Sequence, residues 1–304
     1  MDKTLMAFRY IFLNKKDNFM FIQRLKENIR TTRLAGKLGW AMEANWADPF
    51  LFAIYSIIRP IASSLILVFM YLVVTRGKTS FDLFAYIFLG NAFFMYVYNV
   101  LFGISWVIHE DREHYEMLRY IYISPIRMYY YLFGRGIAKL VTTTIGVIIT
   151  LAFGMIVLKI PIDLLKVNYP LFFITLLVGL FVITCLGILL AGITMLTAHH
   201  SFALTEGLGG VFYLACGAIF QIDLLPSWLQ YISKALPLTY WLELLRRSIL
   251  GKSLSHTLSR YSDLELLLIM LLTTIVLALF SDYIYKSIEY VARKKGKIDQ
   301  VINY

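Results

Sequence analysis

Two tripeptides, Gly77-Lys78-Thr79 and Gly251-Lys252-Ser253, resemble the end of a loop that binds nucleotide phosphates. That loop, GxxxxGKS/T, needs its first glycine because backbone amides and the lysine together surround the phosphates. The position of this glycine holds Leu72 in one case and Arg246 in the other. We therefore expect that the chain alone does not hydrolyse ATP.

Histidines and cysteines are the other candidates for chemistry. His199-His200, followed by Glu206, could hold a metal ion or relay a proton, but a tight polar turn after an apolar run also explains them, and we favour the turn. Neither the HExxH motif of metalloproteases nor the GxSxG motif of serine hydrolases is present. Cys185 and Cys216 lie in apolar runs without ligand spacing, so we expect packing residues, no metal site and no cofactor bound by this chain.

The densest group of charges lies in residues 109–126, between two long apolar runs. Its first turns combine Arg112 with the acids Glu110, Asp111, Glu113 and Glu116. A Ser124-Pro125 break follows, and then a tyrosine-rich return to apolar sequence. We predict a short lever with both ends fixed in lipid, which touches a component on the cytoplasmic side.

Composition places this lever in a membrane protein. The chain has 304 residues, of which 59% are hydrophobic and 16% charged, and its mean hydropathy is +0.69. A helix needs roughly 20 apolar residues to cross a bilayer, and lipid excludes unpaired backbone groups. The apolar runs also lack the alternation of a β-barrel. We therefore predict an all-α polytopic membrane protein.

Six transmembrane helices are predicted from the apolar runs. Their approximate ranges are 49–74, 83–108, 136–158, 169–196, 202–220 and 264–285. Asp48-Pro49 is a favourable helix start, because an N-cap acceptor precedes a proline. Arg59 lies inside the first span, where we expect it to extend toward the headgroups.

Charge predicts the orientation of these helices. Residues 1–48 carry nine Lys and Arg against five Asp and Glu, interleaved with aromatics, which indicates amphipathic helices on a membrane surface rather than nucleic-acid binding. Residues 49–290 form the membrane domain, and 291–304 a basic tail. Nine Lys and Arg lie in residues 1–48, five in 109–139 and five in 286–304, against two in each of the loops at 76–81 and 159–168. We therefore expect both termini and the lever in the cytoplasm, although 223–263 on the other side carries five basic residues as well.

The segment 221–251 is too apolar for a solvated loop. Its aromatic and aliphatic residues recur near helical spacing and are interrupted by Pro226 and Pro237. We predict two short re-entrant helices that close the outer end of the bundle. The residues that we expect at this gate are Gly217, Phe220, Pro226, Trp228, Pro237 and Tyr240.

Two stretches resemble the permease subunits of ABC-2-type exporters, and the similarity covers about residues 35–290. The first stretch has Glu110, Glu113, Glu116 and Leu118, followed by Ser124-Pro125-Ile126. The second has Gly217 to Phe220, Leu225-Pro226-Ser227-Trp228-Leu229, Pro237-Leu238-Thr239-Tyr240 and Arg246. His114-Tyr115 stand where the family commonly has Gly-Thr, and the region before Asp48 is longer than in many members.

The resemblance implies an ATP-driven exporter in which two permease chains, identical or different, work with two ATPase subunits that bind ATP and Mg. The residues that we expect at the ATPase contact are Glu110, Glu113, Glu116, Leu118, Arg119, Ser124 and Pro125. The exported molecule would be hydrophobic or amphipathic: a drug, lipid, peptide or glycan. We expect a multi-pass protein of a prokaryotic plasma membrane. The alternative is a membrane scaffold or assembly factor that anchors a cytoplasmic partner without transport; a passive channel is disfavoured because no charged or carbonyl-rich filter is evident.

Overall fold

The computed structural model describes residues 2–44, 49–76, 81–160, 162–197 and 201–296. Within these ranges the chain forms helices, turns and loops but no β-strand, which confirms the all-α prediction. The α-helices are α1 (Asp2–Ala44), α2 (Pro49–Val74), α3 (Phe81–Tyr96), α4 (Gly103–His109), α5 (Leu118–Ile123), α6 (Met128–Ile156), α7 (Tyr169–Leu196), α8 (Ser201–Ala215), α9 (Ser227–Ala235), α10 (Pro237–Leu250) and α11 (Asp263–Lys294). Short π-helices η1 (Val97–Phe102) and η2 (Glu110–His114) and 3-10 turns η4 (Ile222–Leu224) and η5 (Leu258–Arg260) lie between them.

Five stretches among the described residues are long and apolar enough to cross a membrane. They are Ile54–Val74, Phe81–His114, Met128–Ile156, Tyr169–Leu196 and Asp263–Lys294. The predicted span 202–220, the fifth of the six, is not confirmed, because α8 has 15 residues and covers only about 22 Å. This helix ends at Ala215, and at Gly217 a positive φ of 68° turns the chain.

The helix boundaries agree with the apolar runs except where charged residues are part of a helix. Helix α7 has the predicted bounds, and α2 begins at Pro49, whereas the N-cap Asp48 lies outside the described residues. Helix α6 begins at Met128 instead of residue 136, and α11 continues to Lys294 instead of residue 285. The extension of α6 contains Arg135, and that of α11 contains Arg293. Both arginines are paired with nearby acids, so their charges do not end the helices.

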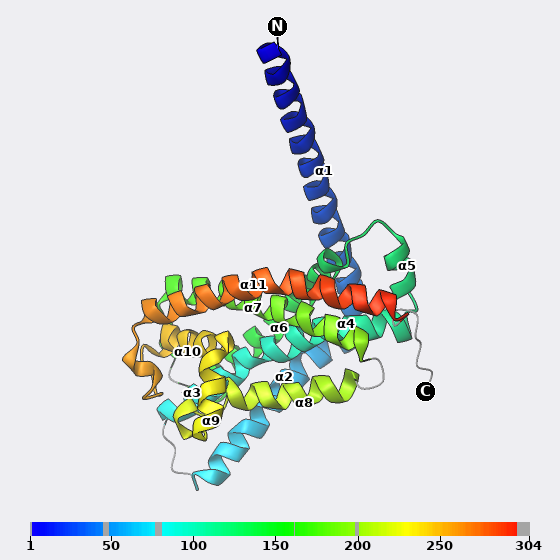
Figure 1. Cartoon of the computed structure of the whole chain (residues 1–304). Helices are drawn as coiled ribbons and strands as arrows, with labels where there is room; N and C mark the ends of the chain where they lie inside the picture. Colours follow the sequence, from blue (N-terminus) through cyan, green and yellow to red (C-terminus); the bar gives the residue numbers. More distant parts are fainter. Residues whose placement is uncertain (1, 45–48, 77–80, 161, 198–200, 297–304) are drawn as a thin grey trace.

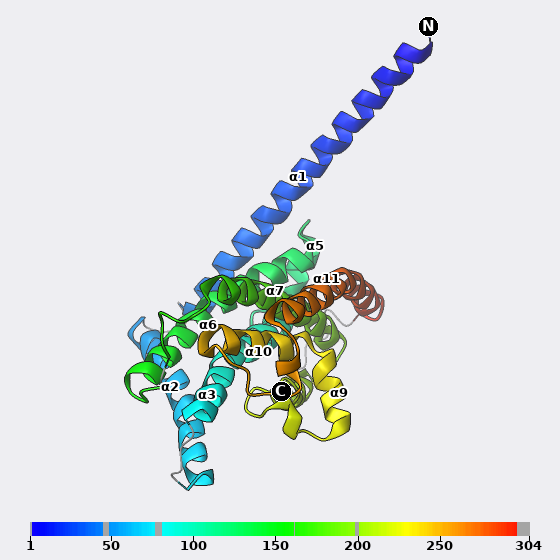
Figure 2. The same ribbon diagram turned by 90° about the vertical axis from the view of Figure 1, so that its left-hand side faces the viewer.

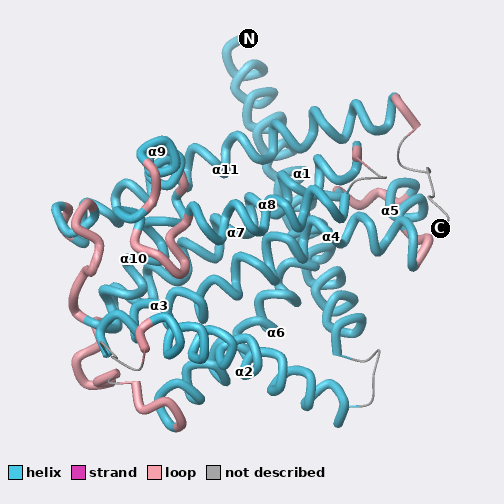
Figure 3. Tube along the Cα trace, turned by 90° about the horizontal axis from the view of Figure 1, so that it is seen from below, coloured by secondary structure: helices cyan, strands magenta, loops and turns pink. Residues whose placement is uncertain are grey.

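The two ends of the helix bundle are different. At one end, called the α10 end, α10 lies beside the starts of α7 and α11 (Figure 1). At the other, called the α5 end, α5 lies beside the last turns of α11 (Figure 1). The same two helices lie at opposite sides of the bundle when it is seen from below (Figure 3). Helices α6, α7 and α11 run between these ends, so the predicted lever and the predicted gate lie at opposite ends of the bundle (Figure 1).

The N-terminal segment forms one continuous helix. Helix α1 starts far from the bundle and meets it near the α5 end, steeply inclined to α7 and α11 (Figures 1 and 2). The last turns of α1 pack against the first turns of α6. Gly134 of α6 makes this close approach possible, because a Cβ there would lie 2.7 Å from the Cβ of Ala35.

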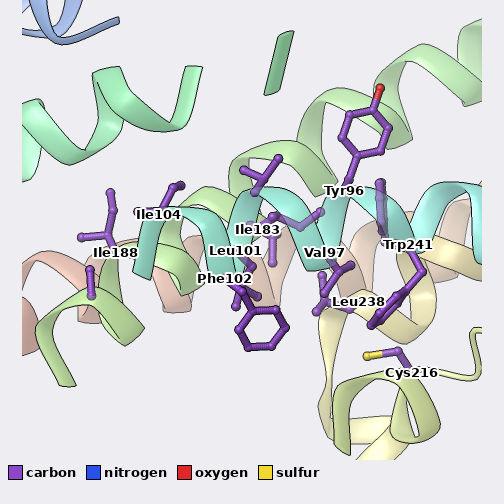
Figure 4. Packing of buried hydrophobic residues seen from close by; sticks show 14 of the residues in the cluster. Tyr96, Val97, Leu101, Phe102, Ile104, Ile183, Ile188, Cys216, Leu238 and Trp241 are labelled. Carbon is purple, nitrogen blue, oxygen red and sulfur yellow. The ribbon is translucent and has the colours of Figure 1, made fainter. Parts of the chain in front are cut away.

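The core joins the second span to α7 and α10. Leu101 and Ile104 of the second span lie beside Ile183 and Ile188 of α7, and all four side chains are fully buried (Figure 4). Trp241 of α10 fills the same core nearer the α10 end. Because α10 belongs to this core, the predicted gate is built on a rigid base rather than on a surface loop.

Candidate coupling and gating sites

The predicted lever is a π-helix followed by a short α-helix. The second span ends in η2 (Glu110–His114), and α5 begins at Leu118. Between them Glu116 has a φ of 49°, a left-handed conformation that is uncommon for residues other than glycine. π-helical turns and left-handed residues occur often at functional sites, so the segment has the geometry of a specialised junction.

A buried ion cluster fixes the start of this lever to α6. Arg135 donates from Nη1 to Oδ1 of Asp111 (3.2 Å) and from Nη2 to Oε2 of Glu110 (3.0 Å). The hydroxyl of Tyr131 donates to the other oxygen of Asp111 (2.7 Å). Arg135 and Asp111 are both fully buried, and such charges are tolerated only when they are paired. Movement of η2 must therefore move the first turns of α6.

The same cluster connects α1. Nη1 of Arg135 lies 2.7 Å from the sulfur of Met42, and Lys139 forms an ion pair with Glu43. The hydroxyl of Thr32 donates to the carbonyl of Tyr130 (3.4 Å). Helices α1 and α6 and the π-helix η2 thus form one mechanical unit at the α5 end.

Helix α5 is supported from behind and exposed in front. Its Leu118 and Ile121 are buried, and the ring of Tyr122 lies under the guanidinium of Arg293 of α11 at 4.8 Å. The opposite face carries Arg119 and Tyr120, and Ile123 is 82% exposed at the end of the helix. Tyr120, Ile123 and Ile126 are all exposed within seven residues, and a cluster of exposed apolar side chains is a feature of surfaces that bind another protein.

The residues predicted for the ATPase contact divide into two groups. Glu116, Arg119 and Pro125 are exposed. The others are engaged within the chain: Glu110 binds Arg135, Glu113 pairs with Arg112 (2.8 Å), Leu118 is 1% exposed in the core, and the hydroxyl of Ser124 donates to the carbonyl of Ile121 (2.6 Å). Sequence reasoning missed Tyr131 and Arg135, although a tyrosine and an arginine four residues apart in an apolar helix were a usable signal.

Two short helices lie in the segment predicted to be re-entrant, and they differ in burial. Helix α9 starts after Pro226 and exposes Trp228, whereas α10 starts at Pro237 and is buried over most of its length. Gly217 and Tyr240 are also buried, while Phe220 is 43% exposed. The six predicted gate residues therefore do not meet at one point: some set helix starts, and others face outward.

Helix α10 is held by a second buried charge network. Glu243, 1% exposed, accepts from Nε of Arg247 (3.2 Å), from the hydroxyl of Tyr86 (3.3 Å) and from the hydroxyl of Ser253. Arg247 also donates to Asp263 at the start of α11 (3.0 Å). These contacts fasten α10 to α3 and α11. The signal for this network in the sequence was the run Glu243-Leu244-Leu245-Arg246-Arg247. A prediction based on hydropathy alone places the three charges of this run at the surface.

A cleft of about 420 Å³ opens beside this network at the α10 end. Its lining includes Lys166, Lys252 and Arg247 together with serines. Lys166 is paired with Asp163 (3.0 Å) and Lys252 with Asp82 (2.6 Å). Because the nearby acids neutralise these cations, the cleft does not select an anionic ligand.

Asp223 fastens the loop that precedes α11 to the turn that follows α8. Its carboxylate accepts from the hydroxyl of Ser255 (2.8 Å) and from both the amide (3.0 Å) and the hydroxyl of Thr257. Partial burial acts to raise the pKa of Asp223, but the hydrogen bonds outweigh it, so this pKa lies below its ordinary value of 3.8. The ionised carboxylate therefore stabilises the fold above about pH 4, and this contribution is lost as the pH falls through the folded-state pKa.

We expect Asp223→Asn to lower the free energy of unfolding by about 1 kcal/mol at pH 7, because amide acceptors bind donors less strongly than a carboxylate does. Hydrogen–deuterium exchange in residues 252–260 should then be faster than in the wild type. The difference should shrink as the pH falls below about 4. The control is Asp163→Asn, an exposed carboxylate at the same end, for which we expect no change. Equal effects of the two variants would contradict the role given to Asp223.

Two polar contacts attach α8 to the second span. The hydroxyl of Tyr98 donates to Glu206 (3.0 Å), and the hydroxyl of Tyr213 donates to Asn91 (3.0 Å). Tyr98 lies in η1, in the middle of the second span. Glu206, considered above together with His199-His200, lies in α8. His199 and His200 lie outside the described residues. Aromatic contacts also join α8 to this span, Phe212 with Phe102 (ring centroids 6.2 Å apart) and Tyr213 with Phe94 (4.8 Å).

Comparison with known proteins agrees with this architecture. A family model described as ABC-2 type transporter matches residues 40–250, which include α2 to α10. No curated protein matches the chain. The matched residues contain the predicted coupling segment 109–126 and the helices α9 and α10, and members of this family generally work with a separate ATPase subunit. The chain therefore belongs to the ABC-2 type transporter family and is a membrane permease component of an ABC transporter.

Proposed function

We propose that this chain is the permease of an ATP-driven exporter, and that its α5 end lies in the cytoplasm. The observation that carries this proposal is the exposed face of α5 on a fixed base. A push on Arg119, Tyr120 or Ile123 reaches α11 through Tyr122. The same push reaches α6 through the Asp111–Arg135 pair at the start of the lever. Rigid elements joined in this way convert a movement of one partner into rocking of the bundle.

The orientation is supported by charge and by α1. Basic residues are most frequent at both termini and around the lever, which favours these segments on the cytoplasmic side. Ile22, Leu25 and Ile29 are exposed on one side of α1, and Lys26 and Arg30 lie beside them. The basic residues of α1 favour a place for this helix near the headgroups on the cytoplasmic side. In this arrangement α8 is a short fifth span, and α9 and α10 cover its outer end, which gives six spans in all.

The assembled transporter contains two permease chains and two ATPase subunits, and ATP and Mg bind to the latter. The ATPase contact includes Glu116 and Arg119 and extends to Tyr120 and Ile123, while Glu113 and Leu118 hold the segment in place. The cargo is a hydrophobic or amphipathic molecule that leaves the cytoplasm. The family match, together with the absence of the phosphate-binding motif from this sequence, supports this division of work.

The contact is tested by purifying the full chain from its native membrane in mild detergent. We expect an ATP-binding subunit to co-purify in equal amount with the wild type. The combined variant Arg119→Glu, Tyr120→Ala and Ile123→Ser should reduce this amount at least tenfold, because it removes the exposed charge and the apolar area of α5. Tyr231→Ala is the matched control, since Tyr231 is 75% exposed on α9 at the other end.

Two outcomes would contradict the proposal. If no ATP-binding subunit accompanies the wild type in repeated preparations, the scaffold alternative, in which the chain anchors a cytoplasmic partner without transport, replaces the proposal. If the subunit co-purifies equally with the α5 variant and the control, the ATPase binds elsewhere on the chain.

A further inference from the structure

Arg246 joins three elements at the α10 end. Its Nη2 donates to the carbonyl of Gly217 (2.9 Å) and to that of Ala218 (2.6 Å), just after the end of α8. Its guanidinium stacks on the ring of Tyr86 in α3, 3.8 Å from the centroid. These three interactions are called the Arg246 contact below. The side chain is fully buried, so the contact is made entirely inside the protein.

The chemistry of the contact suits the end of a helix. The last carbonyls of a helix lack amide partners, and the C-terminal end of the helix dipole attracts a cation. Arg246 supplies that cation just beyond α8, where Gly217 turns the chain in a left-handed conformation. A Cβ on Gly217 would lie 3.0 Å from the carbonyl of Phe220, so this turn is adapted to glycine.

The adjoining segment of α3 is shaped around the guanidinium. A Cβ built on Gly90 would lie 2.7 Å from Cζ of Arg246 and would overlap its Nη2 and the carbonyl of Ala218. A larger residue at position 90 would therefore displace the guanidinium or the carbonyl. Gly90 provides an independent way to break the Arg246 contact without changing Arg246 itself.

The contact links a firmly held helix to a weakly held one. Helix α10 is fixed by Trp241 and by the Glu243–Arg247–Asp263 network. Helix α8 is attached to the second span by a few polar and aromatic contacts. Among the described residues no acid is paired with Arg246, whose partners are carbonyls and a ring. Such partners can be exchanged during a cycle more readily than a buried ion pair.

We propose that Arg246 is a positioning residue for transport, which sets the outer end of α8 relative to α3 and α10. This inference rests on the proposed export function, because α8 is the helix that must move when a path opens beside the second span. When the Arg246 contact is intact, α8 and α10 move together. When the contact is lost, α8 no longer follows the motion of the bundle.

A distance measurement tests the position of α8 without any ATPase. Spin labels at Val211→Cys on α8 and Ile148→Cys on α6 are both in exposed positions, and the native Cys185 and Cys216 are buried. We expect a narrow distance distribution for the full chain in lipid nanodiscs. Arg246→Ala and Gly90→Ala should each broaden it at least twofold. Arg246→Lys should be intermediate, because an ammonium cannot donate to two carbonyls and stack on a ring in the same way.

A double variant tests whether a methyl group can replace the guanidinium. In Gly90→Ala with Arg246→Ala, the new methyl group no longer meets the guanidinium but still overlaps the carbonyl of Ala218, so the thermal midpoint should not rise above that of Arg246→Ala alone. The broad distance distribution should remain, because the carbonyls of Gly217 and Ala218 still lack their donor. The matched control is Arg260→Ala, which replaces an exposed arginine between α10 and α11. Its distance distribution should stay narrow.

Transport by the complete complex gives the second readout. Export per ATP hydrolysed should fall at least tenfold in Arg246→Ala and in the double variant, and two- to fivefold in Arg246→Lys. The inference is overturned if Arg246→Ala and Gly90→Ala leave the distribution narrow, or if the double variant restores it. If the wild type does not transport while the distances behave as expected, the proposed function fails but the role of Arg246 in placing α8 stands.

Discussion

Replacement of Arg135 by alanine is expected to lower the free energy of unfolding by about 3–5 kcal/mol, the range found when one partner of a buried ion pair is removed. The carboxylate of Asp111 is 0% exposed and would keep only the hydroxyl of Tyr131 as a donor. Glu110 would lose its partner as well, and α1 would lose the contact through Met42. Thermal unfolding of the purified chain in detergent measures the change. A permease without this cluster should also lose the link between α5 and α6.

Two further variants show whether the unpaired buried charge causes the loss of stability in Arg135→Ala. Arg127→Ala removes an exposed arginine just before α6 and should change stability by no more than about 0.5 kcal/mol. Asp111→Asn combined with Arg135→Gln removes both buried charges while it keeps similar shapes, and it should recover part of the loss. If Arg135→Ala is no more harmful than Arg127→Ala, the buried cluster does not hold the coupling segment.

Substitution of Gly179 by alanine is expected to cost about 2–3 kcal/mol, near the upper end of the range for overpacking a core. A Cβ at this position of α7 would lie 2.5 Å from Cε2 of Trp241 and would overlap Cδ1 and Nε1 of the same indole. The indole is 0% exposed and has Phe93 and Tyr96 at its edges, so it cannot move aside. The expected result is a lower thermal midpoint and an α10 that no longer packs closely on α7.

Gly207→Ala is the matched control for this prediction. Gly207 lies in helix α8, and a Cβ there would meet nothing within 4 Å. Alanine favours a helix more than glycine does by up to about 1 kcal/mol, so this control should be neutral or stabilising. If the two alanine variants behave alike, close packing between α7 and α10 does not limit the stability of this end of the bundle.

The long helices could be predicted from the sequence because apolar runs of sufficient length have few alternatives in a bilayer. The runs at 49–74 and 169–196 became α2 and α7 with the expected bounds. Pro226 and Pro237 marked the starts of α9 and α10, since proline is well suited to the first turn of a helix, although α2 also holds Pro60 in its interior. Ser124-Pro125 marked the end of α5 for the same reason.

The partners of the buried charges could not be predicted from the sequence. Asp111 and Arg135 are 24 residues apart, and Arg246 lies 29 residues from Gly217. A hydropathy pattern counts each of these charges against burial, so it started α6 too late and assigned no partners to Arg246 and Arg247. The structure shows that burial is tolerated because each charge meets an opposite charge, a carbonyl or a ring.

The sequence by itself determined an all-helical membrane protein, the order of its long helices and the two short segments that carry the family motifs. These properties follow from local hydrophobicity and from the restricted backbone of proline. Only the tertiary structure decided that Leu118 packs inward while Ile123 faces out, that α10 is buried, and that α8 is short and weakly attached. These features depend on contacts between residues far apart in the chain, whose energies no local pattern contains.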